Sequence, residues 1–111
     1  MKRPTTLGDF EQIVLLAILR RGDDAYGVSI RAEIAECTGR AVAPGALYTA
    51  LDRLEDKKLV KSRMGDPTPQ RGGRSKRYYV VTPSGREALA QAQDAYRRLL
   101  EGLDILGAAN A

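Results

Sequence analysis

The stretch from residue 57 to residue 77 constrains the fold more than any other part of this 111-residue chain. It holds eight basic residues and one acidic residue, and prolines and glycines fill its middle. Residues 59–63 alternate weakly, as a half-exposed strand does, and residues 76–82 are rich in β-forming side chains. The pattern predicts two strands joined by a basic turn, which is typical of a wing that contacts DNA.

Three helical patterns precede this stretch, each marked by apolar residues at helical spacing. They begin near residue 7, near Ala25 and at Pro44, and glycines at positions 22 and 39 end the first two. Asp23 and Asp24 are candidate caps for the second helix. Residues 40–43 tolerate β structure and are long enough for a one-rung strand. The third helix is predicted to bury the face made of Leu47, Ala50, Leu51 and Leu54.

A fourth helix follows the second strand. Thr82 is its expected cap and Pro83 its first residue, and the helical pattern runs to about Leu106. A domain this small has little left to cover the apolar stripe of this helix, which makes the stripe a candidate dimer interface. The interface residues are Leu89, Ala92, Tyr96, Leu99, Leu103 and Leu106. We expect a mainly α fold with a small β wing: a winged helix-turn-helix in residues 1–82 and a C-terminal dimerisation helix in residues 83–111.

Composition narrows the class of protein. Apolar residues make up 43% of the chain, which suits one globular domain. A net charge of +4 does not by itself indicate nucleic-acid binding, and the local cluster of basic residues in 57–77 is the stronger signal. One cysteine, Cys37, and no histidine exclude an internal disulfide and the usual zinc site, and a lone thiol fits a reducing cytoplasm. The longest apolar run, residues 13–19, is too short to span a membrane. We expect a cytoplasmic protein without a cofactor.

Two other function classes compete with DNA binding. An enzyme is disfavoured, because the sequence offers no histidine, no phosphate-binding glycine loop and no nucleophile with its base. A winged helix that binds proteins and never touches DNA is the main alternative, since a fold does not fix a function. The eight-to-one charge imbalance of residues 57–77 favours DNA over that alternative.

The sequence also resembles the PadR family of bacterial transcriptional regulators, over roughly Leu7 to Leu89. The pieces that carry the resemblance are Ala25-Tyr26-Gly27, Pro44-Gly45-Ala46-Leu47-Tyr48, Leu54-Glu55, Arg77-Tyr78-Tyr79 and Thr82-Pro83-Ser84-Gly85. The resemblance implies a homodimer built through the last helix, often with the first. It further implies binding to an inverted-repeat operator, usually as a repressor, and it leaves a small-molecule effector open as a further partner.

Candidate contacts with double-stranded DNA follow from their position in the expected fold. They are Gly45, Tyr48, Thr49 and Arg53 on the third helix, Tyr26 and Ser29 near the start of the second, and Arg71, Arg74, Lys76 and Arg77 on the wing. Lys57, Lys58 and Lys61 suit a solvated helix end as well as they suit phosphate contacts. Tyr78 and Tyr79 must face opposite sides of their strand, so one of them belongs to the core.

Overall fold

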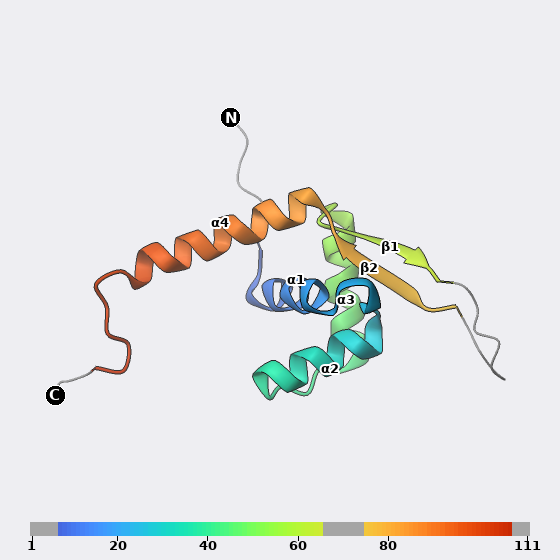
Figure 1. Cartoon of the computed structure of the whole chain (residues 1–111), viewed down its shortest axis with the longest axis horizontal. Coiled ribbons are helices and arrows are strands. Elements are labelled where there is room, and N and C mark those ends of the chain that lie inside the picture. The colour runs from blue at the N-terminus through green and yellow to red at the C-terminus, as the bar shows by residue number, and fades with distance from the viewer. Residues whose placement is uncertain (1–6, 66–74, 108–111) are drawn as a thin grey trace.

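The computed structural model describes residues 7–65 and 75–107 (Figure 1). In chain order its elements are α1 (Asp9–Arg21), the 3-10 turn η1 (Gly22–Asp24), α2 (Gly27–Thr38), α3 (Pro44–Asp56), β1 (Val60–Met64), β2 (Arg77–Val81) and α4 (Pro83–Leu100). This order confirms the predicted winged helix-turn-helix, which is mainly α with a two-stranded wing. No helix within the described ranges is long and apolar enough to cross a membrane.

The core lies where α1, α2 and α3 meet. Val14 and Leu15 of α1 and Ile30 of α2 are fully buried, in keeping with a central first helix. On α3 the four apolar positions predicted to face inward are all buried, and Leu47 and Leu51 are completely so. The helical spacing of those residues therefore fixed the orientation of α3, and its other side faces solvent.

The wing is an antiparallel pair whose register runs from Val60 opposite Val81 to Met64 opposite Arg77. Side chains alternate between its two faces, so Val60, Tyr79 and Val81 close the core from one side. Tyr79 is 5% exposed and is therefore the core tyrosine. Its neighbour Tyr78 is half-buried on the opposite face.

The short extra strand is formed by a different segment from the one predicted. Residues 40–43 form no strand; Val42 is instead buried, and its carbonyl oxygen accepts a hydrogen bond of 2.7 Å from the Arg31 side chain. The extra rung comes from residues 25–26, just before α2. The Tyr79 N–H donates to the Ala25 carbonyl oxygen at 2.9 Å, so a short segment borders β2 on the side away from β1.

Two helix ends differ from the prediction. α2 begins at Gly27, and neither aspartate caps it with its side chain, because the Asp24 carboxylate pairs with Arg21 at 2.7 Å. α4 ends at Leu100 and does not reach Leu106. Gly102 has a φ of +75°, a left-handed conformation that ends a helix, so the chain beyond it leaves the helical stripe.

The start of α4 is fixed to the end of the helix-turn-helix. The Thr82 hydroxyl accepts from the Gly85 N–H at 3.0 Å, as predicted for a cap, and donates to the Lys58 carbonyl oxygen at 2.8 Å. The Thr82 N–H donates to the Leu59 carbonyl oxygen at 3.0 Å. Figure 1 shows α4 leaving the end of β2 and running away from the wing past α1, so its far end projects beyond the three-helix core.

Candidate nucleic-acid interface

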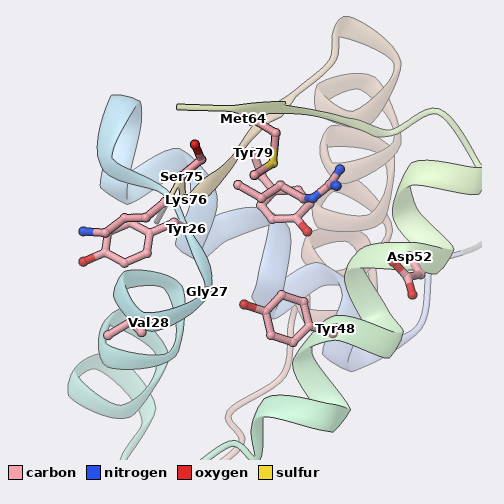
Figure 2. Close-up of a pocket in the computed structure, with 10 residues that line it drawn as sticks. Tyr26, Gly27, Val28, Tyr48, Asp52, Met64, Ser75, Lys76 and Tyr79 are labelled. Atoms are coloured by element: carbon pink, nitrogen blue, oxygen red, sulfur yellow. The ribbon is translucent and has the colours of Figure 1, made fainter. Parts of the chain in front are cut away.

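A hollow of about 680 Å³ opens between the start of α2, the outward side of α3 and the strands of the wing (Figure 2). We call it the wing–helix hollow. Among the residues that line it are Tyr26, Gly27, Tyr48, Asp52, Lys76 and Arg77. The sequence-predicted candidates Tyr26, Tyr48, Lys76 and Arg77 are thus brought together from three separate segments.

The outward side of α3 is slim near its start. Gly45, Thr49 and Arg53 are exposed, and apart from the adjacent backbone of α3 no atom lies within 4 Å of the point where a Cβ would stand on Gly45. The Thr49 hydroxyl donates to the Gly45 carbonyl oxygen at 2.9 Å, which leaves the hydroxyl oxygen as an acceptor toward solvent. A surface of this shape lets a helix approach base edges closely.

Tyr48 bridges α3 and α2. Its side chain keeps an exposed fraction of 46%, and Figure 2 shows its hydroxyl turned toward the start of α2. A Cβ added to Gly27 would lie 2.3 Å from the Tyr48 hydroxyl oxygen, so only glycine at position 27 leaves room for this arrangement. Tyr48 therefore packs on α2 and still presents an edge to the hollow.

Ser29 faces inward and is 4% exposed. Its hydroxyl donates to the Asp24 carbonyl oxygen and accepts from the Tyr26 N–H at 3.0 Å, which caps the start of α2. The side chain is occupied inside the protein, so we leave Ser29 out of the DNA contacts proposed below.

The basic residues at the turn end of strand β2 are held by neighbours. The Lys76 ammonium lies 4.3 Å above the Tyr26 ring, within the range of a cation–π contact. Arg77 donates from Nη1 to the Ser62 hydroxyl at 3.0 Å, and that hydroxyl donates to the Glu55 carboxylate at 2.7 Å. Arg71 and Arg74 lie outside the described residues.

The three lysines before the turn have different surroundings. Lys57 pairs with the Glu11 carboxylate at 3.0 Å, and that carboxylate also accepts from the Gly8 N–H at 2.8 Å. Because Glu11 is 8% exposed, the ammonium of Lys57 neutralises a largely buried acid. Lys58 and Lys61 are exposed. A structural role thus accounts for Lys57, which the sequence alone left undecided.

Two charged residues were missed at the level of sequence, one in the hollow and one on the opposite face of the wing. Asp52 places a carboxylate in the hollow, where it repels phosphate, and its place on the outward face of α3 was the available signal. Arg63 lies with its guanidinium carbon 4.8 Å above the Tyr78 ring. Arg63 belongs to the basic stretch, but only the strand register shows that it stands opposite Tyr78.

Tyr79 also lines the hollow, and burial raises the pKa of its phenol above the ordinary value.

A second polar cluster joins α1 to α2 away from the hollow. Arg20 donates from Nε to Glu33 at 2.7 Å, and this hydrogen bond is the main cause that lowers the pKa of the Glu33 carboxyl. The Cys37 thiol lies 3.4 Å from the same carboxylate, which raises the pKa of the thiol. A thiol held protonated is a poor redox sensor. Among the described residues, no three His, Cys, Asp or Glu side chains gather to hold a metal ion.

The apolar residues toward the C-terminus are largely uncovered. Tyr96 and Leu99 of α4 are 51% and 74% exposed, and Leu103 and Leu106 beyond the helix are 66% and 95% exposed. Ala92 is half-buried. Leu89 differs from the others because it packs in the core of its own chain at 5% exposure.

Comparison with known proteins supports the same interpretation as this geometry. Residues 15–91 match the family described as the transcriptional regulator PadR-like family. The chain belongs to the PadR-like family. It is therefore a regulator of transcription with a DNA-binding winged helix, as the resemblance of its motifs implied.

Individual relatives extend along most of this PadR-family chain. The transcriptional regulator Rv3488 of Mycobacterium tuberculosis is 36% identical over 98 residues, which cover 85% of this chain and 83% of that protein. An uncharacterised 37.1 kDa protein from a transposon of Streptomyces fradiae is 36% identical over 88 residues, or 79% of this chain. The matched region spans only 23% of that larger protein.

Solved structures show the same fold. A transcriptional regulator from Clostridium thermocellum superposes with a TM-score of 0.68 at 26% identity, covering 82% of this chain and 85% of that one. A PadR-family regulator from Clostridium difficile gives a TM-score of 0.65 at 28% identity, covering 88% of this chain and 99% of that one.

Proposed function

We propose that this PadR-family chain is a repressor that binds an inverted-repeat operator as a homodimer and is released by a small-molecule effector. In this proposal α3 enters the major groove, and Gly45, Thr49 and Arg53 face base edges. Tyr26, Tyr48 and the wing residues Lys76 and Arg77 contact the sugar–phosphate backbone. Arg71 and Arg74 remain predicted wing contacts on the basis of sequence.

The observation that carries the proposal is the wing–helix hollow. It places the amino-terminal end of α2, the open side of α3 and two basic side chains of the wing around one concave surface. The free N–H groups and partial positive charge of a helix start favour phosphate, and the two cations add to that preference. Close approach along α3 is left open because Gly45 has nothing within 4 Å of its missing side chain.

The exposed apolar residues toward the C-terminus support the homodimer. We assign the interface to Ala92, Tyr96 and Leu99 on α4, together with Leu103 and Leu106 beyond it, and we omit Leu89 because its own core covers it. Apolar side chains exposed at this level favour a partner in water. In a two-fold dimer the recognition helices stand about 34–36 Å apart, one turn of the duplex.

The test is binding of the protein to the DNA upstream of its own gene, with selection from random duplexes as a second route to the operator. We expect an inverted repeat, and an affinity that falls roughly 10³–10⁵-fold between about 50 and 200 mM salt if the dimer makes about 6–10 phosphate contacts. A folded dimer that shifts no duplex at low salt would instead support a winged helix that binds proteins.

Single substitutions separate contacts with the phosphate backbone from contacts that determine sequence preference. Lys76→Ala should weaken binding to all duplexes alike and reduce the salt slope by about 1, whereas Thr49→Ala should change which duplexes are preferred. Arg86→Ala removes an exposed charge on α4 outside the hollow and serves as the matched control. Equal losses for Lys76→Ala and Arg86→Ala would contradict the assignment of Lys76.

A further inference from the structure

Four side chains form a continuous row that crosses the wing and reaches α2. We call it the aromatic row; in spatial order it is Arg63, Tyr78, Tyr26 and Lys76. Arg63 of β1 stands directly opposite Tyr78 of β2 in the strand register. Tyr26 bridges Tyr78 from the other side of β2. Directly opposed residues of neighbouring strands point to the same face, so these side chains are placed to touch.

The distances show that they do. The Arg63 guanidinium carbon lies 4.8 Å above the Tyr78 ring, and the Lys76 ammonium lies 4.3 Å above the Tyr26 ring. The two rings meet edge to face, with centroids 5.6 Å apart and an interplanar angle of 65°. Each of these three contacts lies within the favourable range for its kind.

The backbone around the row ties the same segments together. The Tyr79 N–H bonds to Ala25 at 2.9 Å, and the Gly65 N–H bonds to the Lys76 carbonyl oxygen at 2.7 Å. A Cβ on Gly65 would lie 2.6 Å from Cε2 of Tyr78, so the ring lies directly against the glycine backbone. Hydrogen bonds on both sides of Tyr78 in the chain therefore tie strand β2 to Ala25 and to Gly65.

We infer that Tyr78 is a positioning residue and that Tyr26, besides its own proposed backbone contact, acts with it: together the two rings fix the angle of the wing to α2 and hold Lys76 where it meets phosphate. This inference rests on the proposed DNA binding. Cations stacked on fixed rings lose less freedom when they bind phosphate than cations on free side chains do. The affinity of the wing for phosphate therefore depends on two neutral residues, Tyr26 and Tyr78.

The neighbouring tyrosine separates positioning from simple stability. Tyr78 and Tyr26 are half-buried, whereas Tyr79 is 5% exposed and belongs to the core. Tyr79→Leu should therefore lower the melting temperature far more than Tyr78→Leu does. If Tyr78 acts by position, its loss should change how binding depends on salt while the protein remains folded.

The experiment measures duplex affinity against salt for the full chain and for Tyr78→Leu, Tyr26→Leu and Tyr78→Phe. Neither leucine variant alters a charge, so a passive role predicts an unchanged salt slope. We expect each to lower affinity about tenfold near 150 mM salt and to reduce the slope by roughly 1, as the loss of one phosphate contact does. Tyr78→Phe keeps the ring and should bind as the unaltered protein does.

Hydrogen exchange gives a second measurement that needs no DNA. Exchange at the Tyr79 amide, which bonds to Ala25, should accelerate at least tenfold in Tyr78→Leu and stay unchanged in Tyr78→Phe. A folded Tyr78→Leu protein with unaltered slope, or with unaltered exchange, overturns the inference. If the unaltered protein binds no duplex at any salt, the proposed function fails, while the exchange measurement still decides whether the rings brace the wing.

Discussion

Replacing Gly85 with alanine tests how α4 is joined to the rest of the molecule. A Cβ at this position would lie 2.1 Å from the Leu59 carbonyl oxygen and 2.8 Å from Cγ1 of Val81. Ordinary contact begins at 3.4 Å, so the first turn of α4 must move away from Leu59 by more than 1 Å. The obstructing atom belongs to the backbone and cannot rotate aside.

The cost follows from what that movement disturbs. Overpacking a well-filled site costs about 1–3 kcal/mol. The hydrogen bond of 3.0 Å from the Thr82 N–H to Leu59 is stretched as well, at about 1 kcal/mol. Alanine returns up to about 1 kcal/mol through its helix propensity. We expect a net loss of about 1–3 kcal/mol in the free energy of unfolding, or a melting temperature lower by roughly 5–15 °C.

Urea and thermal unfolding followed by circular dichroism, at one fixed protein concentration, measure this loss. Gly45→Ala is the matched control, because it also lies in the first turn of a helix but has nothing within 4 Å of the added carbon. It should leave stability unchanged or raise it slightly. Equal stability of the two variants would refute the account of how α4 is attached.

Three further predictions concern the hollow and the cluster between α1 and α2. Gly27→Ala places a carbon 2.3 Å from the Tyr48 hydroxyl oxygen, so duplex affinity measured by fluorescence anisotropy should fall about tenfold. Adding Tyr48→Phe should restore part of that loss, and no recovery would show that the clash is not its cause. Asp52→Asn removes a charge that repels phosphate and should raise affinity about threefold at low salt, with the gain shrinking as salt screens it; a gain independent of salt would argue against electrostatics. Glu33 has a lowered pKa because Arg20 bonds to it, so its contribution to stability is present above its unfolded pKa of about 4.3 and is lost as pH falls through the lower folded value. Glu33→Gln should therefore lower the urea midpoint near pH 7, and the difference should close below about pH 4; a difference constant from pH 3 to pH 7 would contradict the lowered pKa.

Local sequence signals predicted most of the fold. The inward face of α3 followed from helical spacing, the ends of α1 and α2 followed from Gly22 and Gly39, and Thr82 caps α4 as expected. Each of these depends on residues close together in the chain. The same is true of the two strands, whose composition and intervening turn are read within one short stretch.

The features that the sequence did not predict depend on contacts between residues far apart in the chain. Residues 25–26 replace residues 40–43 as the extra rung because β2, far along the chain, offers its free edge to them. Which of Tyr78 and Tyr79 enters the core depends on how the wing settles against the helices. Lys57 could not be assigned because its partner Glu11 lies 46 residues away in sequence.

The connection at Thr82 is rigid, so the wing and the C-terminal helix α4 move together. One residue separates the end of β2 from the start of α4, and four hydrogen bonds hold that residue in place. The 18 residues of α4 extend about 27 Å, so a tilt of about 5° at this connection displaces the far end by about 2 Å. In the proposed dimer, a ligand that spreads the two C-terminal helices slightly would therefore shift both wings relative to their phosphates.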